Sequence, residues 1–237
     1  MKIIYDNVLH GGTYSATNES LNYPVENLDH PFITKRFQAT GNTSTVTIIL
    51  DTAASVDSIG HGVTNATAGT IRVYSGAYDL EATLTMDRDY DPCITYTAST
   101  IAAVTKIEID LTTTDTYAYL GGVSAGVAHE IDYAYAQIER PLTDNTAWQQ
   151  MPGGQSLSNK KTPLRNVPLT FDAASITAAN NLITVYRSVG LGTPMFIEFF
   201  EGARTIFPPL FCCFATVPVD TGSGYDRTIT VNFRECK

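Results

Sequence analysis

The sequence predicts a mainly β protein in which a β-sandwich is followed by a small α+β domain. Short β-branched, apolar segments separated by Gly, Asn, Asp and Thr clusters fill the first half. A single helical periodicity occurs in the second half. With 237 residues, 43% hydrophobic and 16% charged, the chain has the composition of a globular protein of one or two domains.

The first half is expected to consist of β-strands alone. The segments that predict strands are 45–51, 70–75, 82–87 and 104–111. In "KIEIDL" (106–111), charged and apolar side chains alternate, as in a strand with one solvated and one buried face. Such alternation is typical of a sandwich or jelly roll.

The second half has a different pattern, with a strand at 167–171 followed by one helix. Asp172 or Ser175 is placed to cap the start of the helix, and Gly190 is placed to end it. Strands expected at 194–200, 209–217 and 227–235 would form a small mixed or antiparallel sheet that the helix covers. The apolar positions of the helix are Ile176, Ala179, Leu182, Ile183, Tyr186 and Val189, of which Ile183 is expected in the core.

The stretch between the two halves, residues 139–166, is rich in polar, Pro and Gly residues, as in a linker or an extended arm. The expected organisation is therefore a jelly roll at 1–126, a linker or arm at 127–166 and an α+β domain at 167–237.

Acidic residues concentrate in the first half. Residues 1–126 carry 14 acidic and 6 basic side chains, whereas residues 127–237 carry 10 and 9, which gives the net charge of −9. Contact with nucleic acid through a basic surface is therefore not expected. The chain has no apolar run of the length of a signal peptide or a membrane span, so we expect neither membrane insertion nor export by a cleaved signal.

The stretch "NYPVENLDHPFITKRF" (22–37) and the strand after it carry a family resemblance. The residues concerned are Pro24, Asn27, Leu28, Asp29, Thr34, Phe37 and Asp51. They match the Pro, Asn-Leu, Asp, Thr, aromatic and strand-ending Asp of the discoidin or galactose-binding-like family, so the chain resembles that jelly roll over about 22–126. The resemblance implies that Phe37 fills one end of the sandwich, where the family commonly has Trp.

Two kinds of site follow from this resemblance. Sugar-binding members usually expose aromatic residues and an Arg on end loops, and the residues available here are Tyr74, Tyr78, Arg88 and Tyr90. Many members also bind calcium in the entry loop, where Asn27 and Asp29 are candidate oxygen ligands. His30 and Pro31 replace the Gly that commonly follows the Asp, and a turn held by backbone hydrogen bonds is the alternative to a metal site.

"MDRDYD" (86–91) offers a further candidate cation site. Asp87, Asp89 and Asp91 have the spacing with which an EF-hand loop begins. Pro92 occupies the position that needs Gly, and the twelfth residue is Ala98, which excludes a complete EF-hand. The alternatives are a looser calcium site and a solvated acidic hairpin; no other cofactor is expected.

Signatures of catalysis are lacking in the sequence. It contains no HExxH pair, no Gly-x-Ser-x-Gly elbow and no phosphate loop, so we expect no enzymatic activity.

The order of elements in the second half, a strand, a helix and three strands, resembles domains of tailed-bacteriophage virion proteins, particularly those of the tail and baseplate. This resemblance implies a virion structural protein of the tail or tail tip, made in the host cytoplasm. It would assemble with other virion proteins and with copies of itself in a symmetric homo-oligomer, with the jelly roll available to host glycans. The alternative is a carbohydrate-binding module of an extracellular glycan-active system.

Overall fold

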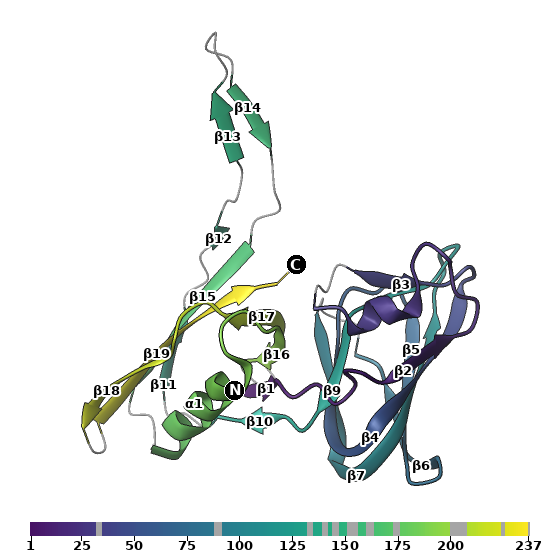
Figure 1. The fold of residues 1–237 in the computed structure, drawn as a ribbon, viewed down its shortest axis with the longest axis horizontal. Coiled ribbons are helices and arrows are strands. Elements are labelled where there is room, and N and C mark those ends of the chain that lie inside the picture. Colours follow the sequence, from purple (N-terminus) through teal and green to yellow (C-terminus); the bar gives the residue numbers. More distant parts are fainter. Residues whose placement is uncertain are drawn as a thin grey trace. The chain divides into compact units, whose positions relative to one another are not determined.

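The computed structural model describes residues 1–31, 35–87, 92–131, 135–138, 142–143, 147–150, 156–159, 164–172, 176–199, 208–223 and 226–236. Over these ranges the chain is mainly β with one α-helix, which confirms the expected fold class (Figure 1). Tertiary contacts divide it into two compact units. The first unit comprises 1–131 with 194–211, and the second comprises 132–193 with 212–237.

The first unit contains a six-stranded antiparallel sheet and a short two-stranded one. The larger sheet consists of β2 (Thr13–Ala16), β4 (Thr43–His61), β7 (Cys93–Thr112), β5 (Ala68–Ser75) and β6 (Asp79–Thr85) in spatial order, with β9 (Val123–Gly126) also paired to β4. The smaller sheet pairs β3 (Arg36–Gln38) with β8 (Tyr119–Gly121), beside the 3-10 helix η1 (Val25–Asp29). All four strands predicted in the first half are present.

The longest strand pairing is that of β4 with β7, which runs from Thr43 opposite Thr112 to His61 opposite Cys93. Its register shifts between Ile49 and Ser58, and such bulges bend a ribbon of two strands. β4 pairs with β2 before this irregularity and with β9 after it. The β4–β7 pair therefore extends through both parts of the sheet, the part that contains β2 and the part that contains β9.

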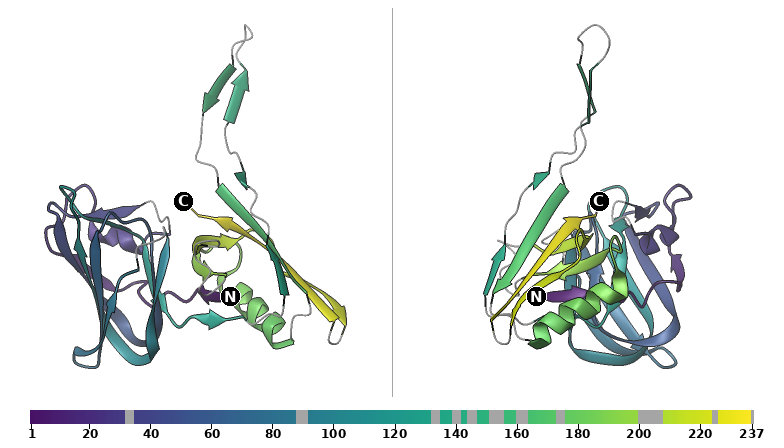
Figure 2. Two further views of the ribbon diagram at one scale, coloured as in Figure 1. Left: turned by 180° about the vertical axis from the view of Figure 1, so that it is seen from behind. Right: turned by 60° about the vertical axis from the view of Figure 1, so that its left-hand side comes forward.

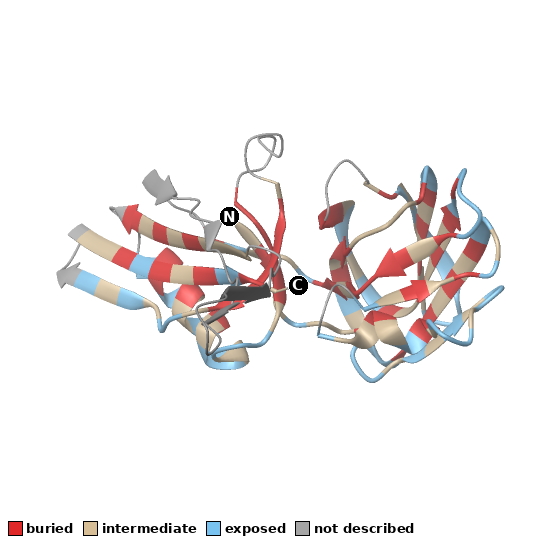
Figure 3. Ribbon diagram, turned by 90° about the horizontal axis from the view of Figure 1, so that it is seen from above, coloured by how far each residue is buried: buried red, intermediate tan, exposed pale blue. Residues whose placement is uncertain are grey.

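The core of the first unit follows from the alternation of side chains along these strands. Buried and exposed residues alternate visibly in Figure 3. One buried apolar cluster includes Val46 and Ile48 of β4, Ile107 and Ile109 of β7, and Phe37 of β3. The alternation predicted for 106–111 and the burial of Phe37 are both confirmed.

Three short strands complete the first unit. β1 (Lys2–Ile4) pairs antiparallel with β10 (His129–Glu130) and with β16 (Met195–Glu198). β16 was expected in the second half, and its pairing with the N-terminal strand is a contact between residues far apart in the sequence.

The second unit is built around β15 (Leu164–Asp172) paired with β19 (Asp226–Glu235). Also paired with these strands are β11 (Tyr135–Ile138), β12 (Leu142–Thr143), β18 (Val219–Ser223) and the end of β17 (Leu210–Phe214). β13 (Ala147–Gln150) and β14 (Ser156–Asn159) pair only with each other among the described residues. β11 and β12 belong to the segment expected as a linker or arm; the limits of 126 and 166 for separate domains stay predictions.

The helix α1 (Ile176–Val189) lies against the sheet of the second unit (Figures 1 and 2). The ring of Tyr186 packs edge-on against Phe214 of β17, with 5.4 Å between ring centroids. Gly190 ends the helix with φ +65°, and its N–H donates to the carbonyl of Tyr186, as predicted. The candidate caps Asp172 and Ser175 lie outside the described side chains. No described helix has the length and apolar character of a membrane span.

The buried face of α1 is rotated from the predicted one. The buried residues are Ala178, Ala179, Leu182 and Val185, whereas Ile176 is 51% exposed. Ile183 is only half-buried, so the prediction that it lies in the core is wrong. Periodicity in the sequence did not distinguish two adjacent stripes, and the sheet packs against the one that carries the small side chains of Ala178 and Ala179.

We expect Phe37→Ala to lower the free energy of unfolding by about 3–5 kcal/mol, because it empties a fully buried aromatic site. Tyr117, which is 38% exposed in the same unit, supplies the control variant Tyr117→Ala with a much smaller loss. Calorimetric melts of the three proteins measure both effects. An unchanged melt for Phe37→Ala would refute its role in the core.

In the helix, we expect Leu182→Ala to cost about 2–5 kcal/mol, because Leu182 is fully buried. Ile183→Ala should cost clearly less, because that side chain is only half-buried. Urea denaturation of the two variants compares the two stripes directly. A larger loss of stability for Ile183→Ala than for Leu182→Ala would show that the face predicted from the sequence is the buried one.

Candidate functional site

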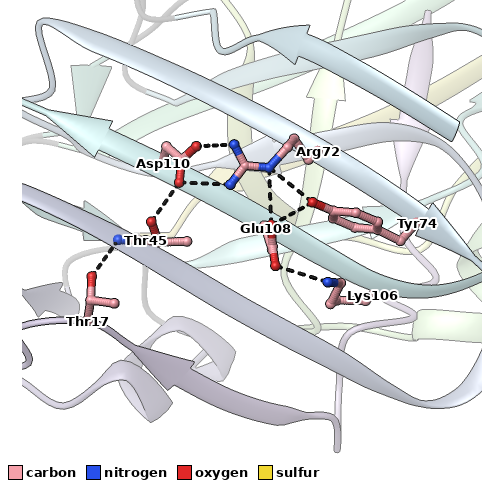
Figure 4. Close-up of polar contacts among 7 residues, drawn as sticks. All are labelled: Thr17, Thr45, Arg72, Tyr74, Lys106, Glu108 and Asp110. Carbon is pink, nitrogen blue, oxygen red and sulfur yellow. Dashed lines mark hydrogen bonds and ion pairs between the residues drawn. The ribbon is translucent and has the colours of Figure 1, made fainter. Parts of the chain in front are cut away.

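Seven polar residues in or directly beside the larger sheet of the first unit form what we call the outer-face network. Its members are Thr17, Thr45, Arg72, Tyr74, Lys106, Glu108 and Asp110 (Figure 4). The register places Arg72 opposite Glu108 and Tyr74 opposite Lys106. Because side chains alternate along a strand, these residues share the face opposite the core.

Arg72 is the centre of this network. Its Nε lies 3.1 Å from Oε2 of Glu108, and its Nη2 lies 3.1 Å from Oδ1 of Asp110. The hydroxyl of Tyr74 donates to Glu108 at 2.7 Å, and Lys106 donates to the other oxygen of Glu108 at 3.0 Å. Two cations therefore face two carboxylates, and the network is neutral.

The network also shifts the pKa values of Glu108 and Arg72. Burial opposes ionisation of Glu108, but hydrogen bonds from Tyr74, Lys106 and Arg72 outweigh it and lower the pKa of this carboxyl. The hydrogen bond to Asp110 raises the pKa of Arg72. Because the charged groups already have partners, a ligand on this face would have to compete with existing ion pairs.

Of the four predicted sugar-binding residues, Tyr74 belongs to this network and Tyr78 lies next to it. The ammonium of Lys106 stands 3.8 Å from the ring centroid of Tyr74 and 4.9 Å from that of Tyr78. Tyr78 is half-exposed in the turn between β5 and β6, with φ +75°. The other two residues, Arg88 and Tyr90, lie outside the described residues. The assignment of these four residues to sugar binding stays a prediction.

The predicted calcium ligands of the entry loop make contacts with protein groups. Nδ2 of Asn27 donates to the carbonyl of Arg36 at 2.9 Å. Both carboxylate oxygens of Asp29 lie 3.0 Å from Nδ1 of His10. These contacts connect η1 to its neighbours, and a calcium role for Asn27 and Asp29 stays a prediction.

The acidic stretch 87–91 is described only at Asp87. The carbonyl of Asp87 lies 2.6 Å from Nε2 of His61, and its N–H donates to the hydroxyl of Thr95 at 3.1 Å. Asp89 and Asp91 lie outside the described residues. Over the described parts of the chain, no three His, Cys, Asp or Glu side chains gather as a metal site. A cation role for Asp87, Asp89 and Asp91 stays a prediction.

A surface groove of about 510 Å³ opens beside η1 and the start of β3. We call it the Tyr23 groove; it is lined by Asn22, Tyr23, Pro24, Asn27, Lys35 and Arg36. The sequence analysis treated this stretch as a structural corner and missed the groove. Two signals could have found it, an aromatic residue beside a Pro and two adjacent basic residues.

Arg36 lies near two aromatic rings in this groove. Its Cζ is 4.6 Å from the ring centroid of Tyr119 and 5.5 Å from that of Tyr23. The strand pairing of Arg36 with Gly121 and the bond from Asn27 hold its backbone. The backbone of Tyr23 accepts a hydrogen bond from Gln38 at 3.1 Å, and the residue is 39% exposed. The backbones of both residues are thus held by the fold.

The first unit is therefore a β-sandwich of antiparallel strands with a groove that contains aromatic and basic residues. No protein-family model matches the chain, and no curated protein matches it.

Solved structures that match about half of the chain include a lectin domain, a carbohydrate-binding module and a fucosidase. One is a lectin-binding domain of lectinolysin complexed with Lewis b, with 10% identity, a TM-score of 0.44, and coverage of 52% of this chain and 96% of that one. Another is a chitosan-binding module from a chitosanase/glucanase of Paenibacillus sp., with 14% identity, a TM-score of 0.44, and coverage of 51% and 98%. A Ruminococcus gnavus fucosidase in complex with fucose shows 12% identity and a TM-score of 0.46 over 54% of this chain and 28% of its own. These values are too low to transfer a ligand or a binding residue.

The outer-face network predicts a particular dependence of stability on pH. Because the folded-state pKa of Glu108 is lowered, its contribution is present above the unfolded pKa of about 4.5 and is lost as pH falls through the folded value. Glu108→Gln should therefore lower the free energy of unfolding at pH 7 by about 1–3 kcal/mol. The decrease in stability between about pH 5 and pH 3 should be smaller in this variant than in the wild type. Urea melts across this range test it. Glu26→Gln, at an exposed glutamate of η1, is the control, and identical pH profiles for both variants would contradict the prediction.

Proposed function

We propose that the first unit is a non-catalytic glycan-binding module and that the Tyr23 groove is its binding site. The observation that carries this proposal is the half-exposed Tyr23 beside Arg36, whose guanidinium lies at cation–π distance from two aromatic rings. Such a pair offers an apolar surface and directed hydrogen-bond donors in one small depression. A sugar ring requires both, because it has apolar C–H faces and hydroxyls around its edge.

The size and chemistry of the groove fit a mono- or disaccharide. A volume of about 510 Å³ falls within the usual range for small-ligand sites. The face of an aromatic ring carries partial negative charge and attracts the weakly positive C–H groups of a sugar. The guanidinium of Arg36 and the amide of Asn22 can donate to hydroxyl oxygens.

Preorganisation favours the groove over the outer-face network. The backbones of Tyr23 and Arg36 are held by hydrogen bonds, and the Arg36 guanidinium lies at cation–π distance from two rings, so less freedom would be lost on binding than from mobile residues. On the outer face, Tyr74 and Lys106 already bond Glu108. A ligand there would gain less, because it would replace bonds that exist.

The residues that line the groove are suited to binding rather than to hydrolysis. Glycoside hydrolysis commonly uses two carboxylic side chains on either side of the scissile bond. The six lining residues include no Asp or Glu. The stretch 22–37, which carries the sequence resemblance to galactose-binding-like domains, also forms the groove, and this coincidence supports the proposal.

A structural role in the tail of a phage virion, with homo-oligomeric assembly, is a second proposal. It rests on the order of elements in the second unit, a strand, a helix and further strands, which the structure contains. A glycan-binding first unit is compatible with this role and equally with an extracellular carbohydrate-binding module. Mass spectrometry of purified virions and of secreted fractions distinguishes the two.

We expect Tyr23→Ala to weaken glycan binding more than tenfold, since it removes the exposed ring that a sugar would stack on. Glycans that bind the full chain are first identified on an array of neutral and acidic glycans. Their affinity is then measured by titration calorimetry. Tyr117→Ala, with nearly the same exposure as Tyr23, should bind like the wild type.

The same assay tests Tyr78, one of the four residues predicted from the sequence. If Tyr78→Ala abolishes binding and Tyr23→Ala does not, the site lies at the turn between β5 and β6, and the groove assignment is wrong. If the wild type binds no glycan on the array, the proposed function is wrong.

A further inference from the structure

We infer that the Tyr23 groove selects glycans that carry an anionic group, a carboxylate or a sulfate, on the sugar that contacts Tyr23. This inference rests on the proposed function and adds the charge of the ligand. Its basis is a pair of adjacent cations, Lys35 and Arg36, that line the groove without acidic neighbours in the lining.

The contrast with the rest of the first half makes this pair unusual. Residues 1–126 contain 6 basic and 14 acidic side chains, so a basic residue without an acidic partner is not the expected outcome. Arg72 and Lys106 follow the expectation, since both pair with carboxylates of β7. Among the described residues, neither Lys35 nor Arg36 has a carboxylate within the 4.0 Å of an ion pair.

The geometry of Arg36 suits a planar anion. Cζ of Arg36 lies 4.6 Å and 5.5 Å from the ring centroids of Tyr119 and Tyr23, which are cation–π distances, and its planar guanidinium carries N–H donors along its edge. Within the described parts of the chain, these N–H groups donate to no protein acceptor. A carboxylate or a sulfate can accept two parallel hydrogen bonds from such an edge, which a single sugar hydroxyl cannot do.

Two cations, Lys35 and Arg36, stand among the described residues that line the groove, in a protein that is acidic as a whole. Burial and then the nearby ammonium of Lys35 lower the pKa of His30, at the end of η1. The net charge of −9 acts over longer distances, but salt screens such distant charges beyond about 8 Å at physiological ionic strength. An anionic sugar would therefore be attracted mainly by Lys35 and Arg36 and would bind more weakly at high salt.

The test compares acidic glycans with counterparts in which the carboxylate is masked as a neutral methyl ester. Trigalacturonate is compared with its methyl ester, and 3′-sialyllactose with its methyl ester, by titration calorimetry on the full chain at 50 and 300 mM NaCl. We expect one acidic member to bind about tenfold or more tightly than its neutral partner, and the preference to fall at the higher salt concentration.

Three variants assign the preference to the groove. Lys35→Gln, at an exposed position, should reduce it, and Arg36→Gln should abolish it. Arg36→Lys should retain only part of it, because an ammonium lacks the planar fork. Arg187→Gln removes the same charge from an exposed position on α1 and should change nothing. Thermal melts confirm that each variant is folded.

The possible outcomes distinguish a failure of this inference from a failure of the proposed function. Equal binding of the neutral and acidic members, with both lost in Tyr23→Ala, overturns the anionic preference and leaves the glycan-binding site in place. Failure of the groove variants to alter a measured preference places the anion elsewhere and also overturns the inference. Binding of an acidic peptide or of single-stranded DNA at the groove, without binding of any glycan, overturns both.

Discussion

The antiparallel pairing of β4 with β7 is the constraint on which the first unit depends. Because side chains alternate along both strands, its register sends Ile48 and Ile107 into the core and Thr45 and Asp110 to the outer face. A shift of one residue would exchange the two sets and would bury the charges of the outer-face network. The apolar core and the saturated polar face are thus two consequences of one register.

The Tyr23 groove depends on a corner at the edge of the same sandwich. Val25, Leu28 and Phe37 are buried in the core, and they anchor η1 and β3 from the inside. The residues between them, Asn27 and Arg36, face each other through a side-chain to backbone hydrogen bond and line the groove outside. Arg72 and Lys106 on the sheet are paired with carboxylates, whereas Lys35 and Arg36 have no carboxylate partner among the described residues. This difference makes the groove the better candidate for binding.

Part of this structure could be predicted from the sequence, and part could not. The alternation in 106–111 and the glycine at 190 act over a few residues, so the strand and the helix end were predicted correctly. The choice between two stripes of α1 depends on the sheet it meets, and the prediction for Ile183 failed for that reason. Likewise, β16 pairs with β1 near the opposite end of the chain, which no local pattern indicates.

By itself, the sequence determined the mainly β class, the single helix, the acidic first half and the resemblance in 22–37, because composition, periodicity and turn chemistry are properties of short segments. Only the tertiary structure decided which polar residues meet. Arg72 contacts Glu108 because β5 pairs with β7, and Arg36 contacts Tyr119 because β3 pairs with β8. Register is fixed cooperatively by burial of the whole sheet, so the site emerges only when the complete sandwich has formed.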